Sequence, residues 1–234
     1  MKKRLLKGFA LVFVTLGMSL GTRAQVSDYS FTQSSGTYVE ISGGTVLGTA
    51  TGSSGAASLD DIVYSVMLPF DFNYSGLNYN QVHVSTNGFI TLGTTAPTTG
   101  NYTPLSNTAA YSGAISAWGG DLNAVFDIAG QTGELRWEEV GITPNREIVI
   151  QWKNFRPAWS TSTTNAAVMD FQIRLSETTN EISVVYGPSA HIIGTTNISA
   201  TRQVGLRGAT NVFPANINNR TNGTGISIDA STAG

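Results

Sequence analysis

The stretch Val82–Gly93, VHVSTNGFITLG, decides the fold class. Runs of alternating apolar and polar residues flank the dipeptide Asn87-Gly88, and Val82 and Val84 share one face of the first run. Asn-Gly between two such runs predicts a tight β-hairpin, because both residues tolerate the positive φ that a type I′ turn requires. The stretch therefore predicts an all-β domain.

The composition agrees with a sheet protein. Only 12% of the 234 residues are charged, 26 are Gly, and Ser, Thr and Asn are abundant. These residue types are poor in helix interiors and favoured in turns. The length suits one large β domain or at most two small ones, and folding can bury about 70% of the surface of the unfolded chain.

Charge and cysteine content exclude several functional classes. The net charge is −2, so no positive excess favours nucleic acid or an anionic membrane surface. The chain has no Cys, which excludes disulfides, thiolate metal sites and thiol nucleophiles. Core packing and sheet hydrogen bonds must therefore stabilise the domain.

The first 24 residues have the pattern of a secretory signal peptide. A basic start precedes the mostly apolar run Phe9–Leu20, and the small residues Thr22 and Ala24 occupy the positions that a signal peptidase reads. We expect cleavage after Ala24 and no membrane insertion of the mature chain. The alternative is a membrane anchor, although the run is shorter than the ~20 residues that a spanning helix needs.

Period-two alternation continues along the mature chain. It predicts two hairpins, Gly133–Val140 with Arg146–Phe155 and Ala167–Ser176 with Glu181–Tyr186, each with one buried and one solvated face. Pro69 is expected to end its strand, and the segment 71–80 to be rich in turns. Shorter strands are predicted at Tyr29–Gln33, Thr37–Ile41, Thr45–Leu47, Ile62–Phe70, Ala114–Trp118, Gln203–Arg207 and Ile226–Asp229.

Roughly a dozen strands at hairpin spacing predict an antiparallel β-sandwich, jelly-roll-like, with no helical period after residue 25. We expect one domain over residues 25–234, with residues 227–234 as the start of a linker. The long polar connection Thr94–Ser112 is expected to be functional or mobile.

Four blocks in order carry a resemblance to a known family: VHVSTNGFITLG (82–93), AISAWGGDLN (114–123), GELRWEEV with REIVIQWKNF (133–155), and MDFQIRLSETTNEISVVYG (169–187). The series resembles an N-terminal β-sandwich module of secreted and cell-surface Bacteroidota proteins and, more distantly, is similar to the nidogen-like extracellular domain. The resemblance implies a secreted or outer cell-surface location and adhesion-type roles. It supplies no catalytic residues.

Three acidic residues on one predicted strand are candidates for glycoside chemistry. Glu134 and Glu138 share a face with Arg136 between them, and Glu139 follows. A glycosidase needs two carboxylates about 5–10 Å apart, which strand neighbours two apart can provide. A solvated face of paired charges is the ordinary explanation.

A candidate calcium site is Asp121, Asn123 and Asp127 in a Gly-rich turn, because oxygen ligands suit Ca²⁺. The spacing lacks the twelve-residue EF-hand loop, and turns select Asp and Asn without a metal. No other cofactor is predicted. The two histidines, His83 and His191, are too far apart in the sequence to suggest a metal site.

Trp159 and Trp118 are candidate ligand-binding aromatics. Trp159 follows Arg156-Pro157 and precedes a polar run, which favours exposure. The alternation of the two hairpins predicts that Trp137 and Trp152 lie in the core.

These observations favour a non-catalytic extracellular module that binds a partner protein or glycan, or that spaces other domains of a surface protein. The alternative is a secreted carbohydrate-binding module or glycoside-active enzyme. A sandwich fold alone does not distinguish them.

Overall fold

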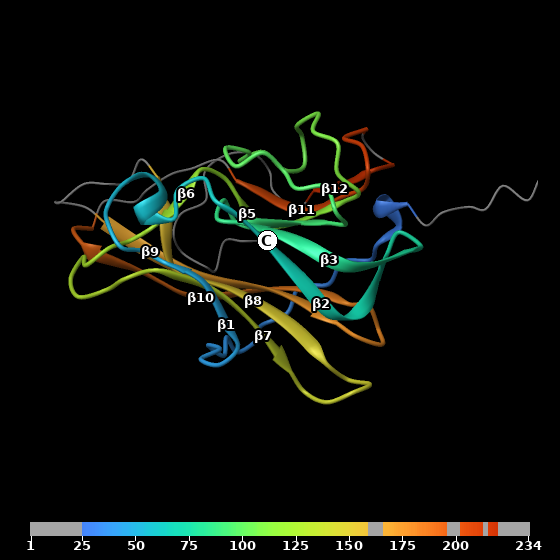
Figure 1. The fold of residues 1–234 in the computed structure, drawn as a ribbon, viewed down its shortest axis with the longest axis horizontal. Helices are drawn as coiled ribbons and strands as arrows, with labels where there is room; N and C mark the ends of the chain where they lie inside the picture. Colours follow the sequence, from blue (N-terminus) through green and yellow to red (C-terminus); the bar gives the residue numbers. More distant parts are fainter. Residues whose placement is uncertain (1–24, 159–165, 196–201, 213–214, 220–234) are drawn as a thin grey trace, which may run out of the picture.

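The computed structural model describes residues 25–158, 166–195, 202–212 and 215–219. Within them, twelve strands form two six-stranded antiparallel sheets, and the predicted β-sandwich is confirmed (Figure 1). Sheet A contains β1 (Thr45–Thr49), β6 (Leu122–Ala124), β7 (Glu134–Val140), β8 (Glu147–Pro157), β9 (Ala166–Ser176) and β10 (Ile182–Ile193). Sheet B contains β2 (Val63–Tyr74), β3 (Leu77–Ser85), β4 (Phe89–Leu92), β5 (Ala114–Gly119), β11 (Gln203–Arg207) and β12 (Ile217–Asn219).

The strand order is β1-β7-β8-β9-β10 in sheet A, with β6 paired to β8, and β12-β11-β5-β4-β3-β2 in sheet B. Consecutive strands are therefore mostly neighbours within one sheet. The connections are those of two meanders rather than of the jelly roll that the sequence suggested. Both predicted hairpins, β7–β8 and β9–β10, are present in the predicted pairing.

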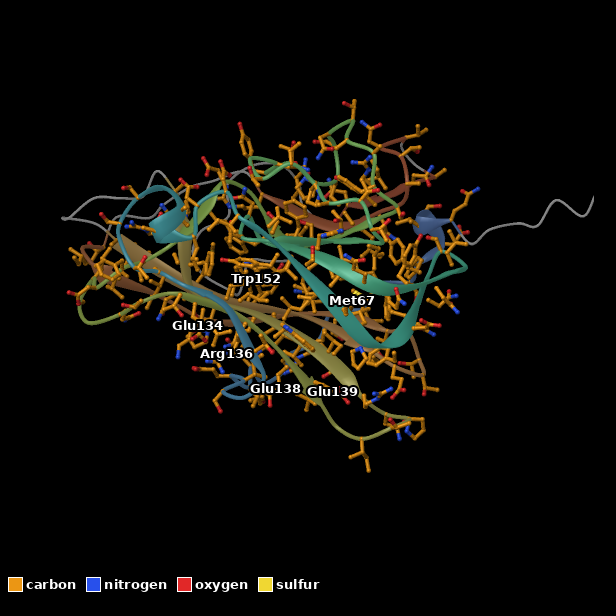
Figure 2. The ribbon with its side chains drawn as sticks, in the orientation of Figure 1. Met67, Glu134, Arg136, Glu138, Glu139 and Trp152 are labelled. Atoms are coloured by element: carbon orange, nitrogen blue, oxygen red, sulfur yellow. The ribbon has the colours of Figure 1, made fainter. Side chains whose placement is uncertain are left out.

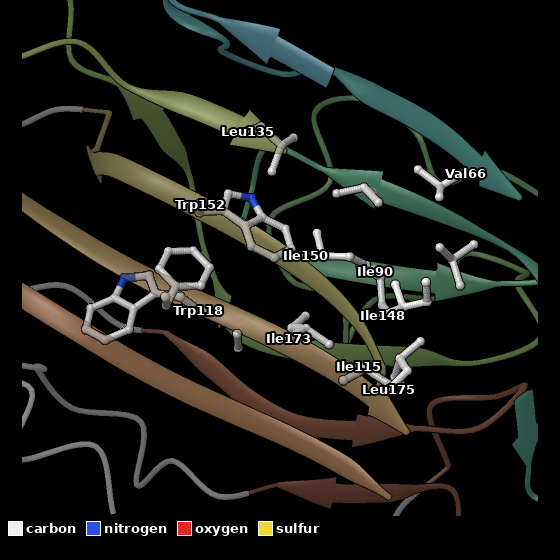
Figure 3. Packing of buried hydrophobic residues seen from close by; sticks show 14 of the residues in the cluster. Val66, Ile90, Ile115, Trp118, Leu135, Ile148, Ile150, Trp152, Ile173 and Leu175 are labelled. Atoms are coloured by element: carbon white, nitrogen blue, oxygen red, sulfur yellow. The ribbon is translucent and has the colours of Figure 1, made fainter. Parts of the chain in front are cut away.

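The core lies between the sheets and follows the predicted alternation (Figure 3). Ile148, Ile150 and Trp152 of β8 and Phe171 and Ile173 of β9 are fully buried. The rings of Trp152 and Phe171 stack with centroids 5.0 Å apart. The indole Nε1 of Trp152 also donates to the Ser85 carbonyl in sheet B at 3.1 Å, so one side chain joins the two layers.

The turn of the β3–β4 hairpin differs from the predicted type I′ turn. Ser85 pairs with Phe89, so three residues form the loop. Gly88 has a φ of +79°, whereas Asn87 keeps a negative φ. The Gly88 N–H donates to the Ser85 carbonyl at 3.2 Å. Only the glycine is left-handed, because a three-residue hairpin loop is a type I turn followed by one left-handed residue.

Two other expectations about strands were wrong. Strand β2 continues past Pro69 to Tyr74, because an edge strand tolerates a missing N–H on its free side. The segments 29–33 and 37–41 are extended but belong to neither sheet. The Val39 carbonyl and the N–H and carbonyl of Ile41 bond glutamine side chains instead of a neighbouring strand. The predicted signal peptide and the predicted strand at 226–229 lie outside the described residues.

Residues 25–43 form an N-terminal arm that contacts both sheets. The arm begins with the 3₁₀ turn η1 (Val26–Asp28), where Val26 is buried and its carbonyl accepts from Asn218 Nδ2 at 3.1 Å. Farther along, the arm crosses the outer face of sheet A from β10 to β7 and then enters β1. The second 3₁₀ turn, η2 (Gly55–Ser58), follows β1.

Candidate binding surface around the long loop

The side chain of Asn87 joins three segments at one end of the sandwich. Its Nδ2 donates to Asp61 Oδ1 at 2.9 Å and to the Thr99 carbonyl at 3.2 Å, and its Oδ1 accepts from the Leu122 N–H at 3.0 Å. Asn87 is fully buried, so these bonds satisfy an amide that would otherwise be costly to bury. The hairpin turn therefore positions the start of β6 and the beginning of the long loop.

The long loop, residues 94–112, lies over the outer face of sheet B and is held there by Arg207 of β11. The guanidinium of Arg207 donates to the carbonyls of Ala109 at 2.6 Å and Asn107 at 3.0 Å and to the Tyr111 hydroxyl at 2.7 Å. Its Cζ lies 4.3 Å from the centroid of the Tyr111 ring. Arg207 is 1% exposed and, within the described residues, forms no ion pair. The loop carbonyls therefore solvate this buried charge.

The surface of the long loop is uncharged and rich in hydroxyl groups. The sequence from Phe72 to Gly120 contains no Asp, Glu, Lys or Arg. Tyr102 is 50% exposed, and the exposed hydroxyl residues around it are Thr94, Thr95, Thr98, Thr99, Thr103, Ser106 and Thr108. Tyrosine and small polar side chains on a fixed loop are typical of protein recognition surfaces.

A group of carboxylates borders this surface where Asn87 holds the loop. Burial raises the pKa of Asp60, and the neighbouring carboxylates of Asp61 and Asp121 raise it further. Burial and Asp61 also raise the pKa of Asp121, while Arg202 opposes the shift. The guanidinium of Arg202 lies across Gly120, and burial lowers its pKa to about 10. The border is thus a group of mutually repelling acids, of which Asp60 and Asp121 are partly buried, beside the Arg202 guanidinium.

The three residues predicted to bind calcium have different surroundings. Asn123 is buried, and its Oδ1 accepts from Arg156 Nε at 3.1 Å, which places a cation where calcium would need a ligand. Asp121 lies near Asp61 and Arg202, and Asp127 is exposed in a separate turn. In the described part of the chain, no three Asp, Glu or His side chains are arranged to hold a metal ion. Calcium binding stays an untested prediction.

The two predicted aromatic contacts have separate outcomes. Trp118 is 5% exposed and packs on Phe171 and Tyr186, with centroids 6.4 and 5.9 Å away. It therefore has no open face for stacking on a sugar. Trp159 lies outside the described residues and remains an untested candidate. The rings of Trp137 and Trp152 pack in or against the core, as predicted.

The acidic residues of β7 all have partners in the fold. Figure 2 shows Glu134, Arg136, Glu138 and Glu139 along this strand of sheet A. Glu134 pairs with Arg136, Glu138 Oε2 accepts from the Gly43 N–H at 3.1 Å, and Glu139 contacts Arg146 at 3.4 Å. These contacts match the ordinary explanation of a charged, solvated face.

A groove of about 370 Å³ opens between the β7–β8 and β9–β10 loops and contains two other carboxylates. Glu177 pairs with Arg146 at 2.6 Å, and Glu147 pairs with Arg174 at 2.9 Å. The hydrogen bond from Arg146 lowers the pKa of Glu177. A general acid in glycoside hydrolysis needs a raised pKa, so Glu177 lacks the property that this role requires.

The structure brings together one pair that the sequence analysis missed. Ser65 Oγ and His83 Nδ1 lie 3.0 Å apart, because β2 and β3 place them in register. His83 is 3% exposed, and its Nε2 is enclosed without a hydrogen-bond partner in the described structure. No carboxylate of the described residues orients the ring as in a catalytic triad. The sequence signal for this pair was the hairpin pattern, because the register of the β2–β3 hairpin determines which residue of β2 lies opposite His83.

In comparisons with known proteins, one family matches most of the chain. The model of the family described as NIDO-related matches residues 28–234. The chain belongs to the NIDO-related family. This membership confirms the nidogen-like resemblance. No curated protein and no solved structure matches significantly. Among the described residues of the NIDO-related domain, no helix is long and apolar enough to cross a membrane.

Proposed function

We propose that this NIDO-related domain is a non-catalytic extracellular module that binds a partner protein or a glycan, or spaces the domains of a modular surface protein. Membership of a nidogen-related family supports an extracellular binding role. The signal-peptide pattern of residues 1–24 supports export. The same proposal includes that the protein comes from Bacteroidota and that the domain is the N-terminal module of a longer protein.

The observation that carries the proposal is the surface of the long loop. Arg207 and Asn87 fix its two ends, so binding would cost little further ordering of the loop. The surface has no charge of its own, and Tyr102 is its exposed aromatic side chain. Hydrogen bonds and ring contacts, rather than ion pairs, would therefore form the interface. Such binding should depend only weakly on salt.

The test is a binding screen of residues 25–234 against glycan arrays and immobilised extracellular proteins, at low and high salt and with or without Ca²⁺. We expect binding that persists at high salt and falls at least tenfold in Tyr102→Ala. Phe31→Ala is the control, because Phe31 is 51% exposed on the arm instead of the loop. Equal binding by wild type and Tyr102→Ala would refute the role of the loop.

The alternative of a carbohydrate-binding module or glycoside-active enzyme is tested in the same screen. Loss of glycan binding in Trp159→Ala with unchanged binding in Tyr102→Ala would transfer the contact role to Trp159. Release of reducing sugar from any polysaccharide by the purified protein would overturn the non-catalytic proposal.

A further inference from the structure

The outer face of sheet A is built to hold an extended peptide. Gln151 of β8 and Gln172 of β9 are cross-strand neighbours, and both are fully buried although they point away from the core. Gln172 Nε2 donates to Gln151 Oε1 at 2.8 Å, and Arg174 Nε donates to Gln172 Oε1 at 3.0 Å. These bonds fix the orientation of both amides toward whatever covers the face.

The described occupant of this face is the protein's own arm, which is held mostly through its backbone. Gln151 accepts from the Ile41 N–H at 2.9 Å and donates to the Ile41 carbonyl at 3.3 Å. Gln172 donates to the Val39 carbonyl at 2.8 Å. The two glutamine amides therefore form hydrogen bonds with the arm backbone, as the edge of a neighbouring strand would. Ile41 is its one buried apolar side chain on this face, whereas Val39 is 59% exposed.

The part of the face beside β7, where Gly43 and Gly44 lie, determines which peptide sequence the face can hold. Glu138 accepts from the Gly43 N–H at 3.1 Å, and Arg136 donates to the Gly43 carbonyl at 2.8 Å. A Cβ at Gly43 would lie 2.5 Å from Glu138 Oε1, and one at Gly44 would lie 2.2 Å from the Trp137 carbonyl. The site therefore requires glycine at position 44, where φ is +69° and the close contacts are with backbone, whereas at position 43 the end of the flexible Glu138 side chain can move aside. The arm of this chain has glycine at both positions.

The arm and β1 form one continuous unit that is separable from the rest of the domain. In the part of the chain that the structure describes, strand β1 is the edge of sheet A and pairs with β7 alone. The segment 30–37 is exposed and lies in no helix or strand. After β1, the segment Gly52–Gly55 is a largely exposed Gly/Ser turn. Within residues 25–49 the buried apolar side chains are Val26 and Ile41, and Tyr29 and Leu47 pack partly against the core. A small set of buried apolar side chains and an exposed hinge are the properties of an element that opens before the rest of a fold.

We propose that the outer face of sheet A is a peptide-binding site in which residues 25–49 of a second copy replace the protein's own. The two copies would exchange these segments with Gly52–Gly55 as the hinge. An identical chain supplies every contact described above, including the two glycines. Exchange of identical elements is a low-cost route to a closed dimer, because no new interface is needed.

Chemical cross-linking tests this exchange, because the natural chain contains no Cys. Glu40 on the arm pairs with Lys153 of β8, and both side chains are partly exposed. The test mixes the single variants Glu40→Cys and Lys153→Cys, incubates them at high concentration, and adds a short bismaleimide. We expect a covalent heterodimer that increases with incubation and exceeds the dimer formed by either variant alone. The double variant is the control for docking, since it should cross-link within one chain.

A hinge variant provides a second measurement. Deleting Ser53 and Ser54 should raise the dimer fraction several-fold in light scattering, because short hinges favour exchange. The double variant shows whether the arm docks at all. If it cross-links internally while the mixture stays at background and the hinge deletion stays monomeric, the proposed exchange is wrong. Loss of ligand binding in Tyr102→Ala would not affect either outcome.

Discussion

The asparagine of the first hairpin shows how much one side chain can determine in this domain. Asn87 was expected to adopt a left-handed turn conformation, yet it keeps a negative φ and uses its amide to bond Asp61, Thr99 and Leu122. Each partner belongs to a different segment. The dipeptide therefore does two separate jobs: Gly88 turns the chain, and Asn87 holds neighbouring loops.

Replacing Asn87 by Ala should destabilise the domain by about 2–4 kcal/mol, because the buried Leu122 N–H loses its acceptor and Asp61 and the Thr99 carbonyl lose their donor. The matched control is Asn78→Ala, since Asn78 is exposed and its side chain accepts a hydrogen bond from Asn73, which is also on the surface hairpin β2–β3. Urea denaturation of both variants measures the difference. A change in Asn87→Ala no larger than in Asn78→Ala would contradict the assigned role.

Among the turns, the β3–β4 loop and the β2–β3 turn form a natural comparison. Gly88 and Gly76 have nearly the same φ, +79° and +77°. A Cβ at Gly88 would lie 2.6 Å from the Trp118 carbonyl, whereas one at Gly76 would meet nothing within 4 Å. We expect Gly76→Ala to cost about 1–2 kcal/mol through its φ alone. Gly88→Ala should cost about 1–3 kcal/mol more through the clash. Equal melting temperatures for the two variants would show that the backbone at Gly88 moves freely.

The long loop depends on Arg207 for its position over sheet B. In Arg207→Met, the carbonyls of Asn107 and Ala109 lose their donor, and Tyr111 loses its cation contact. Amide exchange in residues 101–111 should then accelerate at least tenfold, while β9 keeps its protection. Hydrogen–deuterium exchange with peptide resolution measures both segments at once. Uniform acceleration across the domain would instead indicate global destabilisation.

The strands and the loops differ in how far the sequence predicts them. Alternation predicts β7 to β10 well, because one face of each strand packs on the core and the hydrophobic period records that burial. It mispredicts the arm, since the partners of Val39 and Ile41 are glutamine side chains more than 100 residues away. The proximity of Asp60 to Asp61 and Asp121 and the Ser65–His83 pair were missed for the same reason. Their proximity comes from sheet register and loop packing, and local residue patterns do not contain that information.

For the domain as a whole, the dependence of stability on pH measures how the ionisation of Asp60 affects the fold. Burial raises the pKa of Asp60 above its ordinary value of 3.8, so the folded protein binds this proton more tightly than the unfolded chain does. This contribution to stability is complete below the unfolded pKa and is lost as the pH rises through the folded pKa. At neutral pH, the ionised Asp60 therefore weakens the fold.

Asp60→Asn should accordingly raise the melting temperature at pH 7 relative to wild type and have a smaller effect near pH 3. Asp71→Asn is the control, because Asp71 is exposed on β2. Thermal unfolding across this pH range measures both variants. A pH-independent difference between Asp60→Asn and wild type would contradict the assigned cause.

The crossing of the N-terminal arm has a mechanical consequence. Its hydrogen bonds join β9, β8 and β7 in turn, and its first turn accepts a hydrogen bond from Asn218 of β12. Tension applied at residue 25 would therefore load these attachments one after another rather than together. The arm should detach from the sheets at low force and extend before the paired strands bear any load.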